Sequence, residues 1–164
     1  MFDLHKRLRF ATLPLAMAIG LVVAPVVYAD ETVVSSGNDT ITFTPTVEHV
    51  ADGNIFLDYT FVENFVGIAV GTRVGTGEFV IHPDGMLNTQ NDGIFTGTIA
   101  GRSGTGVMQF WGSGTFASVA GSFNFEQGTD GLAGVHAVGK VVGSATGPTS
   151  FAGADSIKVN FSAP

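Results

Sequence analysis

The sequence predicts an all-β fold: a single antiparallel, closed barrel of roughly eight strands. Short apolar runs alternate with glycine turn signals about every eight to twelve residues, most densely from Gly75 to Gly143. No segment has a convincing helical pattern. The chain also has few charged residues with which to protect exposed sheet edges, and closing a sheet removes those edges. We therefore expect eight to ten strands in one closed sheet.

The first 29 residues have the pattern of a secretory signal peptide. Three basic residues precede an apolar stretch from Phe10 to Val27, and small residues at positions 27 and 29 favour cleavage before Asp30. An uncleaved anchor is the alternative, because the stretch approaches the ~20 residues that span a bilayer. Pro14 and Pro25 favour cleavage. We expect a secreted or periplasmic protein that has no membrane association after signal removal.

The expected mature chain keeps four basic and thirteen acidic residues, a formal charge of −9. A domain of this charge repels phosphate backbones and anionic lipid surfaces, so we expect it to bind neither nucleic acids nor membranes. There is no cysteine, so no disulfide can staple the fold. Its stability must come from a hydrophobic core.

The mature chain divides into a polar lead, residues 30–39, and a barrel domain, residues 40–164. We interpret the lead as a partly ordered tether. The next stretch, from Thr40 to Val47, alternates strictly: Ile41, Phe43 and Val47 share one face, as in a half-buried strand. Pro45 cannot donate a backbone hydrogen bond, so this strand should lie at an edge or be bulged there.

The long segment from Asn54 to Val74 follows a turn at residues 51–54 and is rich in β-branched and aromatic residues. Tyr59, Phe61 and Glu63 fall on one face. We predict that the segment breaks near Glu63 and Asn64 into two strands.

Turn signals divide the rest of the chain. They lie at Pro83-Asp84-Gly85, Asn91-Asp92-Gly93, Gly101 to Gly104 and Gly128 to Gly131. The run GRSGTG from Gly101 superficially suggests a phosphate-binding loop, but no helix follows it, so we predict a plain hairpin with a solvated Arg102. The last strand is expected at Ser156 to Phe161.

The succession of these motifs resembles a bacterial family of unknown function that belongs with the allene oxide cyclase-like barrels. The motifs are GTGEF at 75–79, HPDG at 82–85, AGRSG at 100–104, GSGTF at 112–116 and GTDGLAGVHAVG at 128–139. The resemblance implies an eight-stranded antiparallel barrel related to dirigent proteins and cofactor-free cyclases. It carries no activity, because no cyclase residue maps onto a numbered position. Related barrels often form dimers or trimers, which leaves an oligomer open.

Glu63 is the candidate catalytic residue and Tyr59 its candidate partner. A carboxyl group inside an apolar barrel has a raised pKa and can act as a general acid near neutral pH. Glu78, by contrast, opposes the face that carries Phe79 and Ile81 and is expected to face solvent. The structural alternative places Glu63 at a strand end in water, with Tyr59 in the core.

Phe61, Phe110 and Trp111 are the candidate ligand-binding residues, although such aromatic side chains are more often core. No metal site and no cofactor are expected. Glu78 and His82 lie four apart on one strand, so their Cα atoms stand ~13 Å apart, too far to share one metal ion.

Three functions are compatible with this sequence. The preferred one is an exported barrel that binds a small apolar molecule, since the many glycines leave an eight-stranded barrel room for a ligand. The second is a cofactor-free isomerase or cyclase acting on a small hydrophobic substrate, and whether the protein is an enzyme stays open. The third is a structural or interaction protein with a packed interior and an apolar patch outside.

Overall fold

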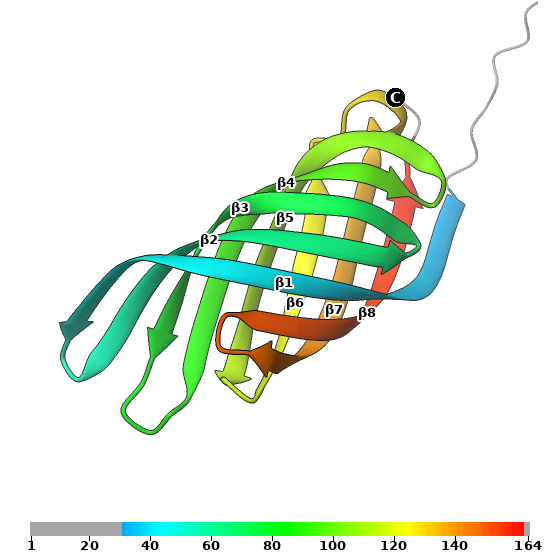
Figure 1. Ribbon diagram of the computed structural model, residues 1–164. Coiled ribbons are helices and arrows are strands. Elements are labelled where there is room, and N and C mark those ends of the chain that lie inside the picture. Colours follow the sequence, from blue (N-terminus) through cyan, green and yellow to red (C-terminus); the bar gives the residue numbers. More distant parts are fainter. Residues whose placement is uncertain (1–30, 163–164) are drawn as a thin grey trace, which may run out of the picture.

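The computed structural model describes residues 31–162, which form one ring-shaped antiparallel sheet (Figure 1). Eight strands follow one another in chain order, with only a three-residue 3₁₀-helix, η1, between two of them. Their bounds are β1 Glu31–Ala51, β2 Asn54–Gly67, β3 Ala69–Ile81, β4 Leu87–Ile99, β5 Arg102–Thr115, β6 Ser118–Glu126, η1 Asp130–Leu132, β7 Val135–Gly147 and β8 Ser150–Phe161. The expected all-β, antiparallel, eight-stranded architecture is confirmed.

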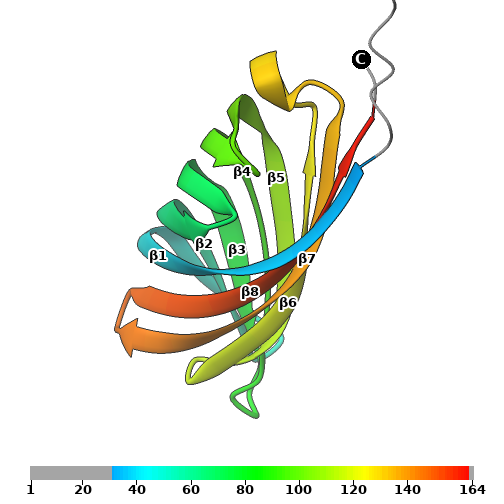
Figure 2. The same cartoon turned by 90° about the vertical axis from the view of Figure 1, so that its right-hand side faces the viewer.

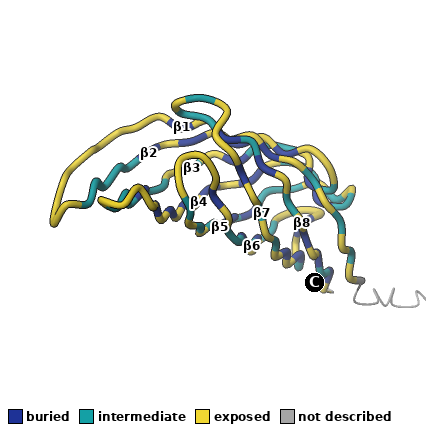
Figure 3. The backbone as a smooth tube through the Cα atoms, turned by 90° about the horizontal axis from the view of Figure 1, so that it is seen from below, coloured by how far each residue is buried: buried dark blue, intermediate teal, exposed yellow. Residues whose placement is uncertain are grey.

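The long first strand brings the two ends of the sheet together. Strand β1 pairs with β8 from Glu31–Phe161 to Thr42–Ser150 and with β2 from Gly37–Gly67 to Ala51–Asn54, so residues 37–42 have partners on both sides. Each strand therefore has two hydrogen-bonded neighbours. The strands coil strongly around the interior, as the turned view shows (Figure 2). The β1–β2 hairpin projects beyond the other strands, and its tip is exposed (Figures 1 and 3).

Residues 31–39, expected to belong to a tether, are instead part of β1, which begins at Glu31. Polar alternation in this segment misled the sequence interpretation, because a strand with one solvent-facing side needs few apolar residues. The expected signal peptide, residues 1–29, lies outside the described residues.

Pro45 marks a bulge, as expected, and it lies beyond the last pair of β1 with β8, where β1 has only β2 as a neighbour. The register of β1 against β2 shifts between Pro45 and Val47. The backbone N–H of Phe43 faces β8 and donates to the carbonyl oxygen of Thr149. The backbone nitrogen of Pro45 faces the same side, but it lies beyond the last residue pair between β1 and β8. No hydrogen bond is lost there. The bulge reverses the facing, so Val47 is 53% exposed instead of sharing the inner face with Phe43.

Two of the turn predictions differ from the structure. The break between β2 and β3 lies at Ile68, so Glu63 is inside a strand and not at its end. Asn91-Asp92-Gly93 is not a turn but part of β4, whose pairing runs continuously with both neighbours. The hairpins at Pro83–Gly85 and around Gly101 are confirmed.

Arg102, expected to be a solvated charge, places its guanidinium carbon 3.9 Å from the centre of the Phe161 ring. This contact joins the start of β5 to the end of β8. Within residues 31–162, no helix is long and apolar enough to cross a bilayer.

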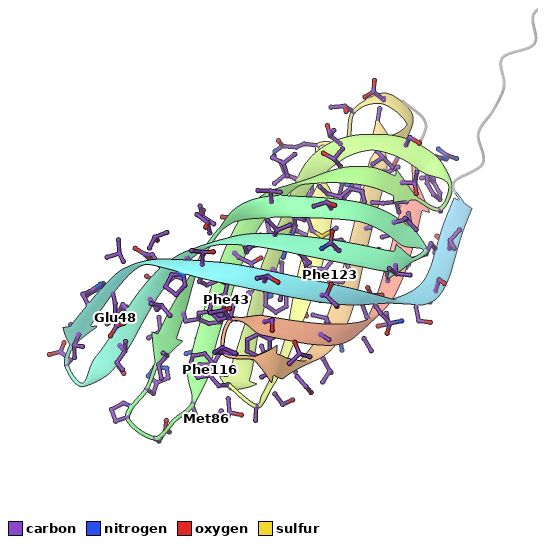
Figure 4. The ribbon with its side chains drawn as sticks, viewed as in Figure 1. Phe43, Glu48, Met86, Phe116 and Phe123 are labelled. Carbon is purple, nitrogen blue, oxygen red and sulfur yellow. The ribbon has the colours of Figure 1, made fainter. Side chains whose placement is uncertain are left out.

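Inward-facing side chains form two apolar clusters inside the ring, and Figure 3 shows buried and exposed residues alternating along the strands. One cluster lies toward η1 and contains Phe123 and Leu132. The other contains Phe43 and Phe79. Figure 4 labels one member of each cluster, Phe43 and Phe123. The polar groups described next lie where these two clusters meet.

Candidate functional site

A buried ion pair lies inside the ring between β2 and β3. Glu63 and Arg73 stand directly opposite each other in the strand register, and both side chains point inward. The Arg73 Nε atom lies 2.6 Å from Glu63 Oε2, although the N–H is not aligned with it as a hydrogen bond. When Glu63 is ionised, a guanidinium at this distance compensates part of the desolvation cost of its charge.

Arg73 is held by further contacts along its length. Its Nη1 donates to the carbonyl oxygen of Met108 over 3.3 Å, and its guanidinium carbon lies 4.7 Å from the centre of the Phe61 ring. Gly93 on β4 leaves room for the stem, because a Cβ there would lie 2.9 Å from Arg73 Cγ. The turn-like Asn91-Asp92-Gly93 sequence thus serves packing inside a strand.

A second carboxyl group, that of Asp39 on β1, reaches Glu63. Burial raises the pKa of Asp39, the hydrogen bond with Glu63 lowers it, and the Asp155 carboxyl on β8 raises it. Burial also raises the pKa of Asp155, while a hydrogen bond from the Gly37 backbone lowers it.

Glu63 holds its proton more tightly than an ordinary glutamic acid. Burial raises its pKa from 4.5 to about 8, Arg73 opposes the rise, and the Asp39 carboxyl adds to it. The hydrogen bond between the two carboxyl groups raises the pKa of Glu63 and lowers that of Asp39. At neutral pH Glu63 therefore keeps its proton beside the Arg73 guanidinium.

Tyr59 begins a hydrogen-bonded chain on the same inner surface. Its hydroxyl lies 2.9 Å from Thr89 Oγ1 and accepts a hydrogen bond of 3.2 Å from Asn91 Nδ2. Burial raises the pKa of Tyr59, so the phenol stays neutral. Asn91 Oδ1 is buried and has no hydrogen-bond partner among the described residues. Asp39 Oδ1 is also buried without a hydrogen-bond partner among these residues.

These groups form part of the wall of a cavity of about 60 Å³. That volume is several times the ~10–15 Å³ needed to hold one water molecule. The polar wall comprises Asp39, Tyr59, Glu63, Arg73, Thr89 and Asn91, and the apolar wall includes Phe43, Phe79, Phe110 and Phe151. A smaller space of about 10 Å³ borders the same charged cluster and is also lined by Asp155.

The arrangement combines two chemical capacities. The aromatic wall offers apolar surface to a small molecule, while the two bare oxygens offer hydrogen-bond acceptors. The protonated Glu63 can also donate a proton near neutral pH. Among residues 31–162, no group of three or more His, Cys, Asp or Glu side chains is arranged to hold a metal ion.

The structure brings Tyr59, Phe61 and Glu63 together on the inner face of β2, where the sequence placed them. The alternative of a solvent-facing Glu63 is wrong. Phe110 is half-buried and lines the cavity. Trp111, expected to bind a ligand in the barrel, is 50% exposed on the outer face and must be removed from that set. It follows Phe110 directly, and adjacent residues of a strand face opposite sides.

Sequence reasoning missed four residues of the polar wall: Asp39, Arg73, Thr89 and Asn91. A signal existed for two of them. Arg73 shares its alternation with Phe79, and Asp39 shares its own with Ile41 and Phe43. Treating residues 30–39 as a tether and Asn91–Gly93 as a turn removed Asp39 and Asn91 from consideration.

Comparison with known proteins gives the fold and no activity. No protein-family model matches the chain, and no curated protein matches it. It is similar to the crystal structure of a protein with unknown function from the DUF3224 family of Shewanella oneidensis MR-1. The TM-score is 0.65 at 15% sequence identity, covering 81% of this chain and 100% of that one. The similarity supports the barrel-like all-β fold.

Proposed function

We propose that this protein is an exported closed barrel, of the allene oxide cyclase-like kind, that binds a small and largely apolar molecule in its interior. The observation that carries the proposal is the cavity of about 60 Å³, which has an aromatic wall and a few convergent polar groups. Such a combination is the usual character of a small-molecule site. Export rests on the pattern of the first 29 residues.

Gly143 allows the cavity to be filled without disturbing its walls. It lies on the inner side of β7 and lines the cavity, and an added Cβ would meet no atom closer than 3.6 Å. Its φ is not in the left-handed region, so a side chain is compatible with the backbone. Replacement by valine or leucine should therefore occupy the space that a ligand would use.

The experiment titrates the wild type, Gly143→Ala, Gly143→Val and Gly143→Leu with 1-propanol and follows amide shifts by NMR. We expect saturable shifts at cavity residues in the wild type, weakened stepwise and lost in Gly143→Leu, while all four proteins stay folded. Equal shifts in all four proteins, or none in the wild type, would contradict interior binding.

The mass of the exported protein, measured after denaturation, tests cleavage before Asp30.

An isomerase or cyclase remains the second candidate, and one observation favours it. The Glu63 carboxyl, whose pKa is raised to about 8, borders the cavity with Tyr59 and could protonate a bound substrate at neutral pH. The carboxyl is not isolated, however, because Arg73 and Asp39 both contact it. Turnover of a hydrophobic substrate that is lost in Glu63→Gln, with binding retained, would favour this function over binding alone.

The outer surface also carries the apolar residues that a structural role would use. Val62, Val74 and Ile94 are direct cross-strand neighbours on β2, β3 and β4, and all three are exposed. No described group indicates what covers this row. It therefore adds no preference among the three functions.

A further inference from the structure

Among the buried side-chain atoms of the cavity residues, those without a hydrogen-bond partner within residues 31–162 are three acceptors, Asp39 Oδ1, Glu63 Oε2 and Asn91 Oδ1, and one donor, Arg73 Nε. Two residues of the cavity wall, Asp39 and Asn91, each have a side-chain oxygen, Oδ1, that is buried without a hydrogen-bond partner among the described residues. Asp39 is 7% exposed and Asn91 is 5% exposed, so neither can rely on bulk water. A buried acceptor without a partner is costly, and a ligand that donates hydrogen bonds removes that cost.

Charge selects among the possible donors. The inner cluster contains three carboxyl groups, on Asp39, Glu63 and Asp155, and one guanidinium, on Arg73. Arg73 is already engaged by Glu63, the Met108 carbonyl and the Phe61 ring. The carboxyl groups outnumber this guanidinium by three to one, so the cluster favours a cationic ligand over an anionic one.

The aromatic wall is consistent with the same selection. Phe43, Tyr59 and Phe79 pack with ring centroids 4.5 to 5.5 Å apart, and all three line the cavity. Aromatic faces attract a desolvated ammonium group and also cover a short hydrocarbon chain. A cavity of about 60 Å³ limits the part of the ligand held inside to a head group and a few carbons.

We propose that the ligand of this cavity is a small primary amine, bound as its ammonium ion against Asp39 and Asn91 with its hydrocarbon part against the aromatic wall. This inference rests on the proposed function, since it names the chemical class that the interior would take. An ammonium group has three donors and no acceptor, which matches two bare acceptors beside a carboxyl pair.

Binding should release a proton. The groups facing Glu63 are Asp39 from β1, Tyr59 from its own strand, Arg73 from β3 and, through Asp39, Asp155 from β8. A bound ammonium favours the ionised form of the carboxyl pair. Glu63 then gives its proton to solvent, and the ammonium replaces that proton as the positive partner of the pair. Affinity for the ammonium ion should thus rise as the pH increases from 6 toward 9.

The test compares propylamine, 1-propanol and propionate, which share a carbon chain and differ in charge, by calorimetric and NMR titration of the mature protein. We expect propylamine to bind at least tenfold more tightly than 1-propanol and propionate not to bind. In Asp39→Asn the preference for the amine should fall to about twofold or less, with 1-propanol little changed. Asp92→Asn removes a carboxylate from the outer face of β4 and should behave as the wild type.

Proton release is measured on the wild type alone, by titrating propylamine in buffers of different ionisation enthalpy at pH 7. This measurement holds even if Asp39→Asn fails to fold. Binding of 1-propanol with no preference for the amine, or amine binding without proton release, overturns the inference and leaves the proposed function standing. Preferential binding of propionate overturns it in favour of Arg73. If none of the three compounds binds, both proposals fail.

Discussion

Glu63 should govern how the free energy of unfolding changes with pH. Its pKa is about 8 in the folded protein and near 4.5 when exposed. Below about pH 4.5 both states keep the proton, so its stabilising contribution is fully present. Between these values only the unfolded state releases it. The free energy of unfolding should therefore fall with rising pH by up to about 5 kcal/mol and level off above pH 8.

Urea denaturation between pH 5 and pH 9 measures this dependence. Glu63→Gln should flatten the dependence of the free energy of unfolding on pH. Glu78→Gln, on the outward-facing side of β3, should keep the wild-type slope. Asp39 contributes in the same direction, because burial raises its pKa as well. A Glu63→Gln protein with an unchanged slope would show that another group carries the pH dependence.

Substitution by alanine should have opposite effects on the free energy of unfolding at Gly77 and at Gly143. A Cβ at Gly77 would lie 2.5 Å from Tyr59 Cζ and 2.6 Å from Asn91 Cβ, so Gly77→Ala must displace the tyrosine ring. We expect a loss of ~1–3 kcal/mol in the free energy of unfolding. Gly143→Ala should be neutral or stabilising by ~0.5–1 kcal/mol, because the site is open and alanine suits a strand interior better than glycine. Chemical denaturation measures both variants. Equal changes in the free energy of unfolding for Gly77→Ala and Gly143→Ala would contradict the prediction that Gly77 is tightly packed and Gly143 is not.

At the scale of the element, β1 shows how one strand can have two roles. Its first half completes the pairing of β8, and its second half forms the projecting hairpin with β2. The bulge between Pro45 and Val47 separates the part that faces the interior from the part that does not. An alternating pattern read across this bulge assigns Val47 to the wrong face.

Deletion of residues 31–37 should open the ring, because β8 would lose its partner from Asp155 to Phe161. We expect a lower thermal midpoint and aggregation through the freed β8 edge, measured by thermal unfolding and light scattering. Val34→Thr is the control, since it changes an exposed side chain and keeps the backbone pairing. A truncated protein as stable and monodisperse as this control would support the tether interpretation after all.

At the scale of the whole molecule, the polar wall of the cavity depends on four consecutive strands. Asp39, Glu63, Arg73 and Asn91 come from β1, β2, β3 and β4 in that order. The apolar residues that face them, among them Phe110, Val141 and Phe151, come from β5, β7 and β8. Only a sheet that curls back on itself brings these two sets to opposite sides of one small space.

Sequence alone determined the fold class and the facing of individual strands. Turn residues and a two-residue period are local properties, so the strand count, the Pro83–Gly85 hairpin and the shared face of Tyr59, Phe61 and Glu63 could be predicted. The same two-residue period also predicts that Arg73 faces inward, but it does not identify Glu63 as its partner.

Tertiary structure decided the rest, because strand register is non-local. Pairing placed Arg73 opposite Glu63, and β1 brought Asp39 to the same carboxyl. Continuous ladders on both sides held Asn91 in a strand despite its turn-like neighbours, since the room at Gly93 is filled by Arg73. The pKa of Glu63 followed from that assembly, because burial and charged neighbours exist only once distant strands have paired.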